Sequence, residues 1–322
     1  MKLLILFLLG LSTLNANTIL DNYRLHGINN LEKQLDYELT SPKYWEKVLQ
    51  NKDTTFGYLE SYSSVLSCDK NNSTLSLYKQ DENNTYTLQK KYGAFTGEVA
   101  GDKQIEGDKK TPIGIYKIEK KLNKETKLDP FYGPLAFVTS YPNLYDKIQG
   151  KSGSGIWVHG LPIKRERDDF TRGCIAINNT NIECLDEKIH ISNTILIINQ
   201  NEHIKASKEK INLLLTQLFK WRYSWIYSDI QTYLSFYAND FTRFDGMKIE
   251  QFSTYKTRVF KKSEKKIILF SNINIIPYPN TKDIYQITFK EYYKSNTFEF
   301  YGDKILMVRI DEANNFKIFV EK

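Results

Sequence analysis

A histidine and a cysteine fifteen residues apart are the side chains of this sequence best suited to catalysis. His159 ends the run Ile-Trp-Val-His, and Cys174 follows Gly173 in the run Thr-Arg-Gly-Cys. An imidazole beside a thiol takes the thiol proton and leaves a thiolate, which is the stronger nucleophile. The chain has only three cysteines and four histidines. We therefore predict that this pair is catalytic, although a buried structural cysteine and a core histidine remain the alternative.

The glycine before the cysteine suits a reaction at a carbonyl group. Gly173 lets the backbone approach a substrate closely, because it carries no side chain. The backbone N–H groups of Gly173 and Cys174 are predicted to form an oxyanion hole for an acyl-transfer intermediate.

These residues and a segment upstream resemble the signature of the YkuD-type L,D-transpeptidase catalytic domain. That signature is His-Gly, a gap, and then Ser/Thr-any-Gly-Cys with an aliphatic residue. It is met here by His159-Gly160 and by Thr171 to Ile175. Thr111-Pro112-Ile113-Gly114 resembles the hairpin segment of the same family, and the resemblance covers residues 56 to 200. Many members of the family have an arginine or asparagine two residues after the cysteine, where this chain has Ala176. The family's specificity for the donor substrate is therefore not assigned to this chain.

The pattern from residue 55 to 202 predicts a mostly β catalytic domain, with the nucleophile at the rim of a cleft. Short β-prone stretches alternate there with turn residues, and 75–78 and 86–90 read as a hairpin. Residues 182–185 read as a short helix. Further strands are expected at four places: Gly114–Ile118, Leu135–Thr139, Gly155–His159 and Thr194–Ile198.

The N-terminal residues predict export. Residues 1–16 combine Lys2, an apolar run from Leu3 to Leu11 and a small-residue exit at Ala16, which is typical of a cleaved signal peptide. Residues 17–54 are expected to be helical, with a further helical turn beginning at Pro42. This segment is too small to fold alone. We expect it to pack either on the catalytic domain or on a second copy of the chain, which would make a homodimer.

Residues 205–322 predict an α+β domain rich in aromatic side chains. A helix over 211–227, followed by Asp229, Tyr233 and Tyr237, resembles the opening of the nuclear transport factor two-like fold. After residue 238 the chain reads as a run of β-prone segments to its end, with closing strands expected over 284–293, 302–310 and 316–321 in a cone-shaped sheet with helices. Its concavity is either a ligand pocket or a filled core. Asp229 and Asp240 are interpreted as helix caps, and the domain as a binding module.

Composition excludes several other classes of function. The formal charge of +7, which becomes +6 without Lys2, is not accompanied by any nucleic-acid motif or arginine-rich stripe. The histidines and cysteines lack the spacing of metal ligands, so we expect neither a metal nor a cofactor. Cys68 and Cys184 are interpreted as two single thiols, with a disulfide between them as the alternative.

This layout of domains resembles the cell-shape-determining peptidoglycan L,D-carboxypeptidases of helical bacteria. The resemblance implies a periplasmic enzyme that removes the terminal D-alanine from stem tetrapeptides through a thioester on Cys174, with cell-shape proteins as partners. His159 would be the acid and base, and the Gly160 carbonyl would orient its ring. One alternative is an L,D-transpeptidase that crosslinks diaminopimelate residues. Another is a wall-binding adaptor with a residual cysteine site.

Substrate contacts are predicted from the residues around the pair. Arg172 is expected to bind a stem-peptide carboxylate or to pair with Asp168 or Asp169. Thr171 is expected to bond within the turn or to the substrate, and Trp157 to form a cleft wall or to pack in the core. Three further cations are interpreted as part of a lid, with a solvated loop as the alternative: Lys164, Arg165 and Arg167.

Overall fold

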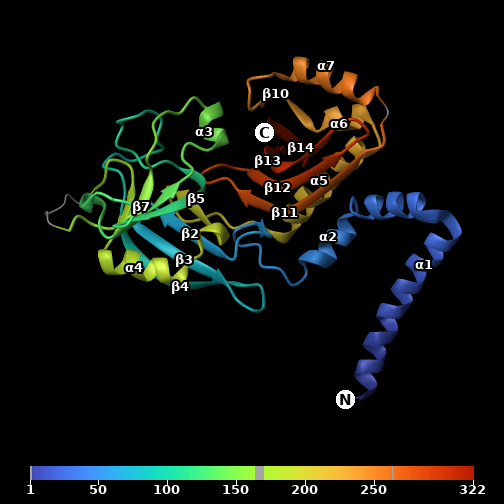
Figure 1. The fold of residues 1–322 in the computed structure, drawn as a ribbon, viewed down its shortest axis with the longest axis horizontal. Coiled ribbons are helices and arrows are strands. Elements are labelled where there is room, and N and C mark those ends of the chain that lie inside the picture. Colours follow the sequence, from blue (N-terminus) through green and yellow to red (C-terminus); the bar gives the residue numbers. More distant parts are fainter. Residues whose placement is uncertain (1, 164–169, 263) are drawn as a thin grey trace.

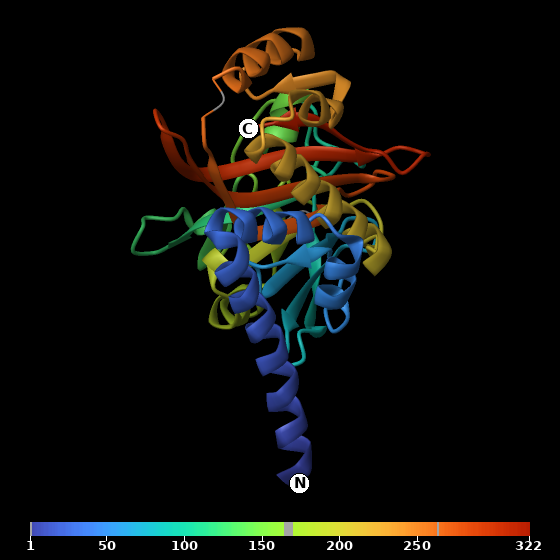
Figure 2. The ribbon, with the colours of Figure 1, turned by 90° about the vertical axis from the view of Figure 1, so that its right-hand side faces the viewer.

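The computed structural model describes residues 2–163, 170–262 and 264–322 of the chain. Figure 1 shows a β-barrel beside a second, sheet-and-helix unit. Helix α1 (Lys2–Glu38) runs away from both units at its N-terminal end, as Figure 2 shows, and is interrupted at Gly27, whose φ is 75°. Within the described residues, no helix combines the length and the apolar composition that crossing a membrane requires.

Eight strands among the described residues close into the barrel, in the order β2-β3-β4-β8-β7-β6-β5-β9. The pairs β2–β9 and β7–β8 are parallel, and the other neighbours are antiparallel. The strands are β2 (Ser64–Asp69), β3 (Thr74–Gln80), β4 (Tyr86–Phe95), β5 (Gly114–Asn123), β6 (Leu135–Thr139), β7 (Trp157–His159), β8 (Ile175–Ile177) and β9 (Thr194–Asn199).

The barrel confirms the strands that alternation and turn residues predict. The expected hairpin is β3 and β4, and the strand expected from Gly155 begins only at Trp157, since Gly155 has a φ of 71°. The short helix expected over 182–185 is part of a longer one. The connecting elements are η1 (Pro130–Tyr132), α3 (Leu144–Ile148), α4 (Asn179–Lys188) and η2 (Ile191–Asn193).

In the described part of the chain, the second unit is a six-stranded sheet, in the order β1-β11-β12-β13-β14-β10, with α5 packed against it. The predicted long helix and the three predicted closing strands are present. The strands are β1 (Tyr58–Leu59), β10 (Tyr237–Arg243), β11 (Ile267–Pro277), β12 (Ile284–Lys294), β13 (Glu299–Ile310) and β14 (Phe316–Glu321), and the helices are α5 (Lys208–Ile226), α6 (Ile230–Ser235) and α7 (Ile249–Phe260).

Two expectations for this unit are wrong. Residues 249–260, which were expected to be β-prone, form α7, because Phe252, Lys256 and Phe260 recur every four residues and are buried together on one face. Asp240 is not a helix cap; it lies on β10 and pairs with Arg309 of β13. Asp229, in contrast, does cap α6, since its carboxylate accepts the Thr232 N–H at 3.0 Å.

The helices of the N-terminal segment pack on the second unit, and its last residues contact the barrel. Helix α2 (Pro42–Leu49) begins at the predicted proline and lies against α5, with the Trp45 ring 4.9 Å from that of Phe219. Asp36 near the end of α1 forms a buried ion pair with Arg222 of α5 at 2.9 Å. The expected packing on the catalytic domain holds for the end of the segment, where Asp53 Oδ2 accepts the Tyr86 N–H of β4 at 2.8 Å. Its helices are bound to α5 instead, by aromatic packing and a buried ion pair.

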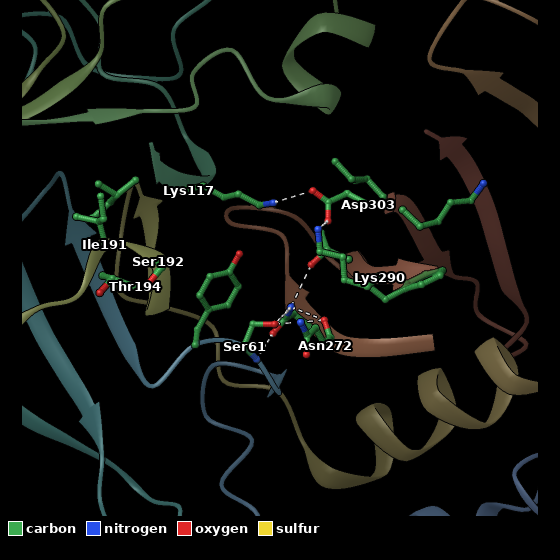
Figure 3. A pocket seen from close by; sticks show the side chains of 15 residues that line it. Ser61, Lys117, Ile191, Ser192, Thr194, Asn272, Lys290 and Asp303 are labelled. Atoms are coloured by element: carbon green, nitrogen blue, oxygen red, sulfur yellow. Dashed lines mark hydrogen bonds and ion pairs between the residues drawn. The ribbon is translucent and has the colours of Figure 1, made fainter. Parts of the chain in front are cut away.

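The two units share a continuous interface. Strand β1 precedes the barrel in sequence yet pairs with β11 of the other sheet, and apolar side chains from both units form one buried cluster. A polar cavity of about 260 Å³ lies beside this interface, and Figure 3 shows the side chains that line it. Across it, Lys117 of β5 lies 3.9 Å from Asp303 of β13, which also pairs with Lys290 at 2.7 Å. The barrel is thus held against the second unit by backbone pairing, apolar packing and charge.

Candidate active site

Parallel pairing of β7 with β8 brings His159 and Cys174 to one cavity. Val158 lies opposite Ile175 in this pair, so Cys174 stands at the start of β8 near Trp157. The Cys174 Sγ accepts the Trp157 N–H at 3.4 Å and donates to the Gly155 carbonyl at 3.3 Å. His159 and Cys174 both line a cavity of about 840 Å³. A thiol and an imidazole separated in sequence are therefore open to the same substrate.

The His159 ring is oriented by the backbone of the next residue. His159 is buried, and its Nδ1 lies 2.6 Å from the Gly160 carbonyl oxygen. A carbonyl only accepts hydrogen bonds, so Nδ1 carries the proton and Nε2 is left as the basic nitrogen. This contact is the one that the sequence interpretation of Gly160 requires.

Gly160 has no room for a side chain. A Cβ at this position would lie 2.5 Å from Asn179 Oδ1 and 2.8 Å from Pro134 Cδ. Asn179 is itself held in place, because its Oδ1 accepts the Leu161 N–H at 2.7 Å. The close approach of these segments fixes the carbonyl that orients His159.

The turn before the nucleophile also depends on a glycine. Gly173 has a φ of 128°, and a Cβ there would lie 2.8 Å from the Lys110 carbonyl oxygen. Thr171 braces the turn from inside: its Oγ1 donates to the Cys174 carbonyl at 2.7 Å and accepts the Gly173 N–H at 2.9 Å. Thr171 thus bonds within the turn. The predicted oxyanion role of Gly173 would require its N–H to share or leave this bond.

The other predicted substrate residues lie at different distances from the cavity. Arg172 is exposed and lines it. Trp157 is half-buried and packs at a tilt against Tyr132, with ring centroids 4.7 Å apart, but it is not among the residues that line the cavity. The residues interpreted as a lid, and the two acidic residues considered as partners of Arg172, lie outside the described residues: Lys164, Arg165, Arg167, Asp168 and Asp169.

Tyr132 is a cavity residue that the sequence interpretation missed. Its ring lines the cavity 5.1 Å from the His159 ring, edge to face. Burial, reinforced by the nearby Cys174, raises the pKa of its phenol. Tyr132 ends η1, which Asp129 caps by accepting the Phe131 N–H. The sequence Asp-Pro at 129–130, followed by Gly133, is a turn signal that could have placed an aromatic side chain between β5 and β6.

Charges of both signs surround the cavity. Glu98 and Lys109 form an ion pair at 2.6 Å on its rim, and Glu106 also lines it. Lys103 lines it as well, while its Nζ donates to Asp108 at 2.8 Å. That ion pair and three backbone N–H donors outweigh partial burial and hold the pKa of Asp108 well below its usual range.

Three further sequence expectations concern residues away from the catalytic pair. Ala176 is fully buried opposite His159 on β8, so this position makes no contact with a substrate. Cys68 and Cys184 are free thiols and not a disulfide. Among the residues that the structure describes, no group of three or more His, Cys, Asp or Glu side chains could hold a metal ion.

The second unit has its own cavity, of about 570 Å³, with an aromatic and charged lining. Lys256 lies there with its Nζ 4.5 Å from the centre of the Trp225 ring. Burial lowers the pKa of Lys256 to about 8, although Glu321 opposes this shift. Lys304 and Glu291 face the same space. The concavity expected for this fold is therefore partly open.

The fold and the site together define a class of protein. A β-barrel with a cysteine and a histidine on two parallel strands is joined to a cone-shaped sheet with helices. Residues 63–197 match the YkuD L,D-transpeptidase catalytic domain, and residues 213–322 match the Cds6 C-terminal NTF2-like domain.

Solved structures extend this match over both units. The chain is similar to the helical cell shape determining protein Pgp2 from Campylobacter jejuni, with 40% identity and a TM-score of 0.80, over 88% of this chain and 100% of that one. It is also similar to Bd1075 of Bdellovibrio bacteriovorus, with 26% identity and a TM-score of 0.66, over 84% and 96%. The chain therefore belongs to the YkuD-type L,D-transpeptidase family, in the form that carries an NTF2-like C-terminal domain.

A curated relative matches only the catalytic part. YafK of Escherichia coli strain K12, which carries a provisional L,D-transpeptidase name, is 31% identical over 115 residues. The match spans 35% of this chain and 42% of YafK, so the chain covers less than half the length of that relative.

Proposed function

We propose that this protein modifies peptidoglycan and contributes to cell shape, and that it does so as a cysteine-dependent L,D-carboxypeptidase. In this proposal it removes the terminal D-alanine from stem tetrapeptides and leaves tripeptides. The observation that carries the proposal is the shared cavity of Cys174 and His159, with Nδ1 of His159 held by the Gly160 carbonyl. This arrangement leaves a basic nitrogen and a thiol facing one substrate space.

The proposed reaction is an acyl transfer through a thioester. His159 Nε2 takes the Cys174 proton, and the thiolate attacks the carbonyl carbon of the bond between diaminopimelate and D-alanine. The Trp157 N–H donates to the sulfur and thereby favours the thiolate. His159 then gives the proton to the departing amine of D-alanine, and a water molecule, activated by the same nitrogen, hydrolyses the thioester. We assign the oxyanion contact to the backbone N–H of Cys174 and to that of Gly173, which shares or leaves its bond to Thr171 Oγ1 when the oxyanion forms.

The charges at the cavity suit a substrate that itself carries both signs. A stem peptide ending in diaminopimelate and D-alanine presents carboxylates and an amine. In the proposal, Arg172 binds a carboxylate through two parallel hydrogen bonds, and Glu106 lies on the same lining as a partner for the amine. Tyr132 supplies an apolar wall beside His159.

The remaining parts of the chain complete the proposal. We assign residues 1–16 to an export signal and place the enzyme in the periplasm, where its polymer lies. Residues 55–202 form the proposed catalytic domain, and residues 205–322 a binding module. A role in cell shape is supported by the similarity over both units to Pgp2, a helical cell shape determining protein.

The activity is tested with purified protein and disaccharide tetrapeptide, followed by mass spectrometry of the products. We expect disaccharide tripeptide and free D-alanine from the wild type and from Cys184→Ala, a control that removes a thiol elsewhere, and none from Cys174→Ala. Dimers crosslinked between diaminopimelate residues would instead assign the protein as a transpeptidase. An unchanged tetrapeptide in every sample would contradict an enzymatic role and favour a wall-binding adaptor.

A further inference from the structure

A largely buried set of charges adjoins the loops that line the active-site cavity. Lys151 Nζ is 2.5 Å from Asp102 Oδ2 and 2.9 Å from Asp146 Oδ1. The Lys151 side chain is 3% exposed and that of Asp146 is 0% exposed. Burial acts to lower the pKa of Lys151, but Asp146 and Asp102 outweigh it, so that the pKa lies above its ordinary value. The three side chains form one charged unit, in which Lys151 and Asp146 are shielded from solvent and the Asp102 side chain is 29% exposed.

One end of this unit is bound to the second domain. Asp146 lies on α3 and accepts the Tyr116 hydroxyl and the Asn143 N–H, each at 3.0 Å. Asn143, which caps α3, donates from its side chain to the Tyr278 hydroxyl at 3.2 Å. Tyr278 is buried and directly follows β11 of the NTF2-like sheet. A hydrogen bond thus connects α3 of the barrel unit to the NTF2-like sheet docked against it.

The other end reaches the nucleophile by two routes. Asp102 Oδ1 accepts the Ile113 N–H at 2.7 Å, so one carboxylate holds both ends of the loop 102–113. The Lys110 carbonyl of this loop packs against Gly173, where it leaves no space for a Cβ. The segment that follows Lys151 leads to Gly155, whose carbonyl accepts the Cys174 thiol at 3.3 Å.

We propose that Asp102 and Lys151 are positioning residues that hold the Gly173–Cys174 turn against β7 and link this geometry to the docked NTF2-like domain through Tyr278. A buried ion pair adds little net stability compared with apolar side chains of similar volume, so its value here is geometric. Both segments that touch Gly173 and Cys174 are irregular backbone, and the Asp102–Lys151 contact joins them. The inference rests on the proposed function only in taking Cys174 as the reactive group.

The test measures the alkylation rate of Cys174 by iodoacetamide as a function of pH, by peptide mass mapping of the full-length protein. Asp102→Asn keeps an acceptor for Ile113 but removes the charge that holds Lys151. The turn then loosens, and the Trp157 N–H no longer favours the thiolate as strongly. We expect the apparent pKa of Cys174 alkylation to rise by about one unit, and the rate at pH 7 to fall about tenfold. Cys184 in the same sample should keep its rate.

Two further variants separate positioning from general loosening. Tyr278→Phe removes only the hydroxyl at the domain contact and should slow Cys174 about two- to threefold. Asp303→Asn breaks the exposed contact with Lys117 between the same domains and should leave the rate unchanged, because exposed ion pairs contribute little. If Asp102→Asn does not fold, Tyr278→Phe tests the proposal alone.

The proposal is overturned by an unchanged pH profile of Cys174 in a folded Asp102→Asn or Tyr278→Phe protein. An equal slowing of Cys184, or an equal effect of Asp303→Asn, also overturns it, since either result indicates unspecific loosening. Alkylation needs no substrate. If the pH profile of Cys174 alkylation shifts in the variants but the wild type leaves tetrapeptide intact, the positioning role is supported and the carboxypeptidase activity is rejected. Failure of one proposal can therefore be told apart from failure of the other.

Discussion

Replacing Gly160 by alanine tests how the structure orients the catalytic base. The added Cβ would lie 2.5 Å from Asn179 Oδ1, 2.8 Å from Pro134 Cδ and 3.2 Å from Gly133 Cα. Pro134 Cδ belongs to a proline ring and Gly133 Cα to the backbone, so neither atom can move away easily. Overpacking of this kind costs about 1–3 kcal/mol of folding free energy. For a domain of this size, that lowers the melting temperature by roughly 2–12 °C.

The effect on catalysis should be larger than the effect on stability. Relief of the clash requires the Gly160 backbone to shift, and its carbonyl is the group that lies 2.6 Å from His159 Nδ1. A displacement of about 1 Å in a catalytic group can lower a rate about 100-fold. We therefore expect kcat for tripeptide release to fall about 10- to 100-fold.

The assay compares initial rates and thermal melts of Gly160→Ala and Gly93→Ala. Gly93 lies on β4 of the same barrel, and a Cβ there meets nothing within 4 Å, so this control should behave as wild type. The reasoning is refuted if Gly160→Ala retains both the rate and the melting temperature of Gly93→Ala, because the glycine would then not be needed to place the carbonyl.

Three further predictions concern the anchoring of α1, the second cavity and the cavity wall. Asp36→Asn, which leaves the Arg222 charge buried, should lower the unfolding free energy in urea by about 3 kcal/mol, whereas the exposed Asp21→Asn should not change it. The pKa of Lys256 in the folded protein, about 8, is below its unfolded value, so the unfolded state binds more protons between pH 8 and 10.5. The free energy of unfolding in urea titrations should therefore rise over that range by up to about 3 kcal/mol relative to Lys256→Met. Tyr132→Ala should lower kcat/KM about tenfold in the tripeptide assay, and Tyr132→Phe should retain the wild-type value.

Local signals predicted the barrel strands and much of the site. Alternation of apolar residues bounded by turn residues predicted β3, β4, β5, β6 and β9. The turn before Cys174 could also be predicted from the sequence. Gly173 adopts a backbone conformation that other residues avoid, and the Thr171 hydroxyl can bond within the turn. The contact of Gly160 with His159 joins neighbouring residues, so that it too could be predicted from the chain.

Interactions over long sequence distances could not be predicted in this way. Asp36 and Arg222 are 186 residues apart, and neither carries a local signal for its partner. The same holds for Asp102 and Lys151, which meet only when two loops pack together. Helix α7 was missed because Thr254, Thr257 and Val259 favour strands locally, while burial of one face decides in favour of the helix.

The measurement that tests the central claim most directly is the mass of the protein after rapid acid quench during turnover of disaccharide tetrapeptide. The account predicts an adduct with the mass of the disaccharide tripeptide acyl group, mapped to the peptide that contains Cys174 and lost in Cys174→Ala. Release of tripeptide by Cys174→Ala, or an adduct on a different residue, would contradict the assignment of Cys174 as the nucleophile.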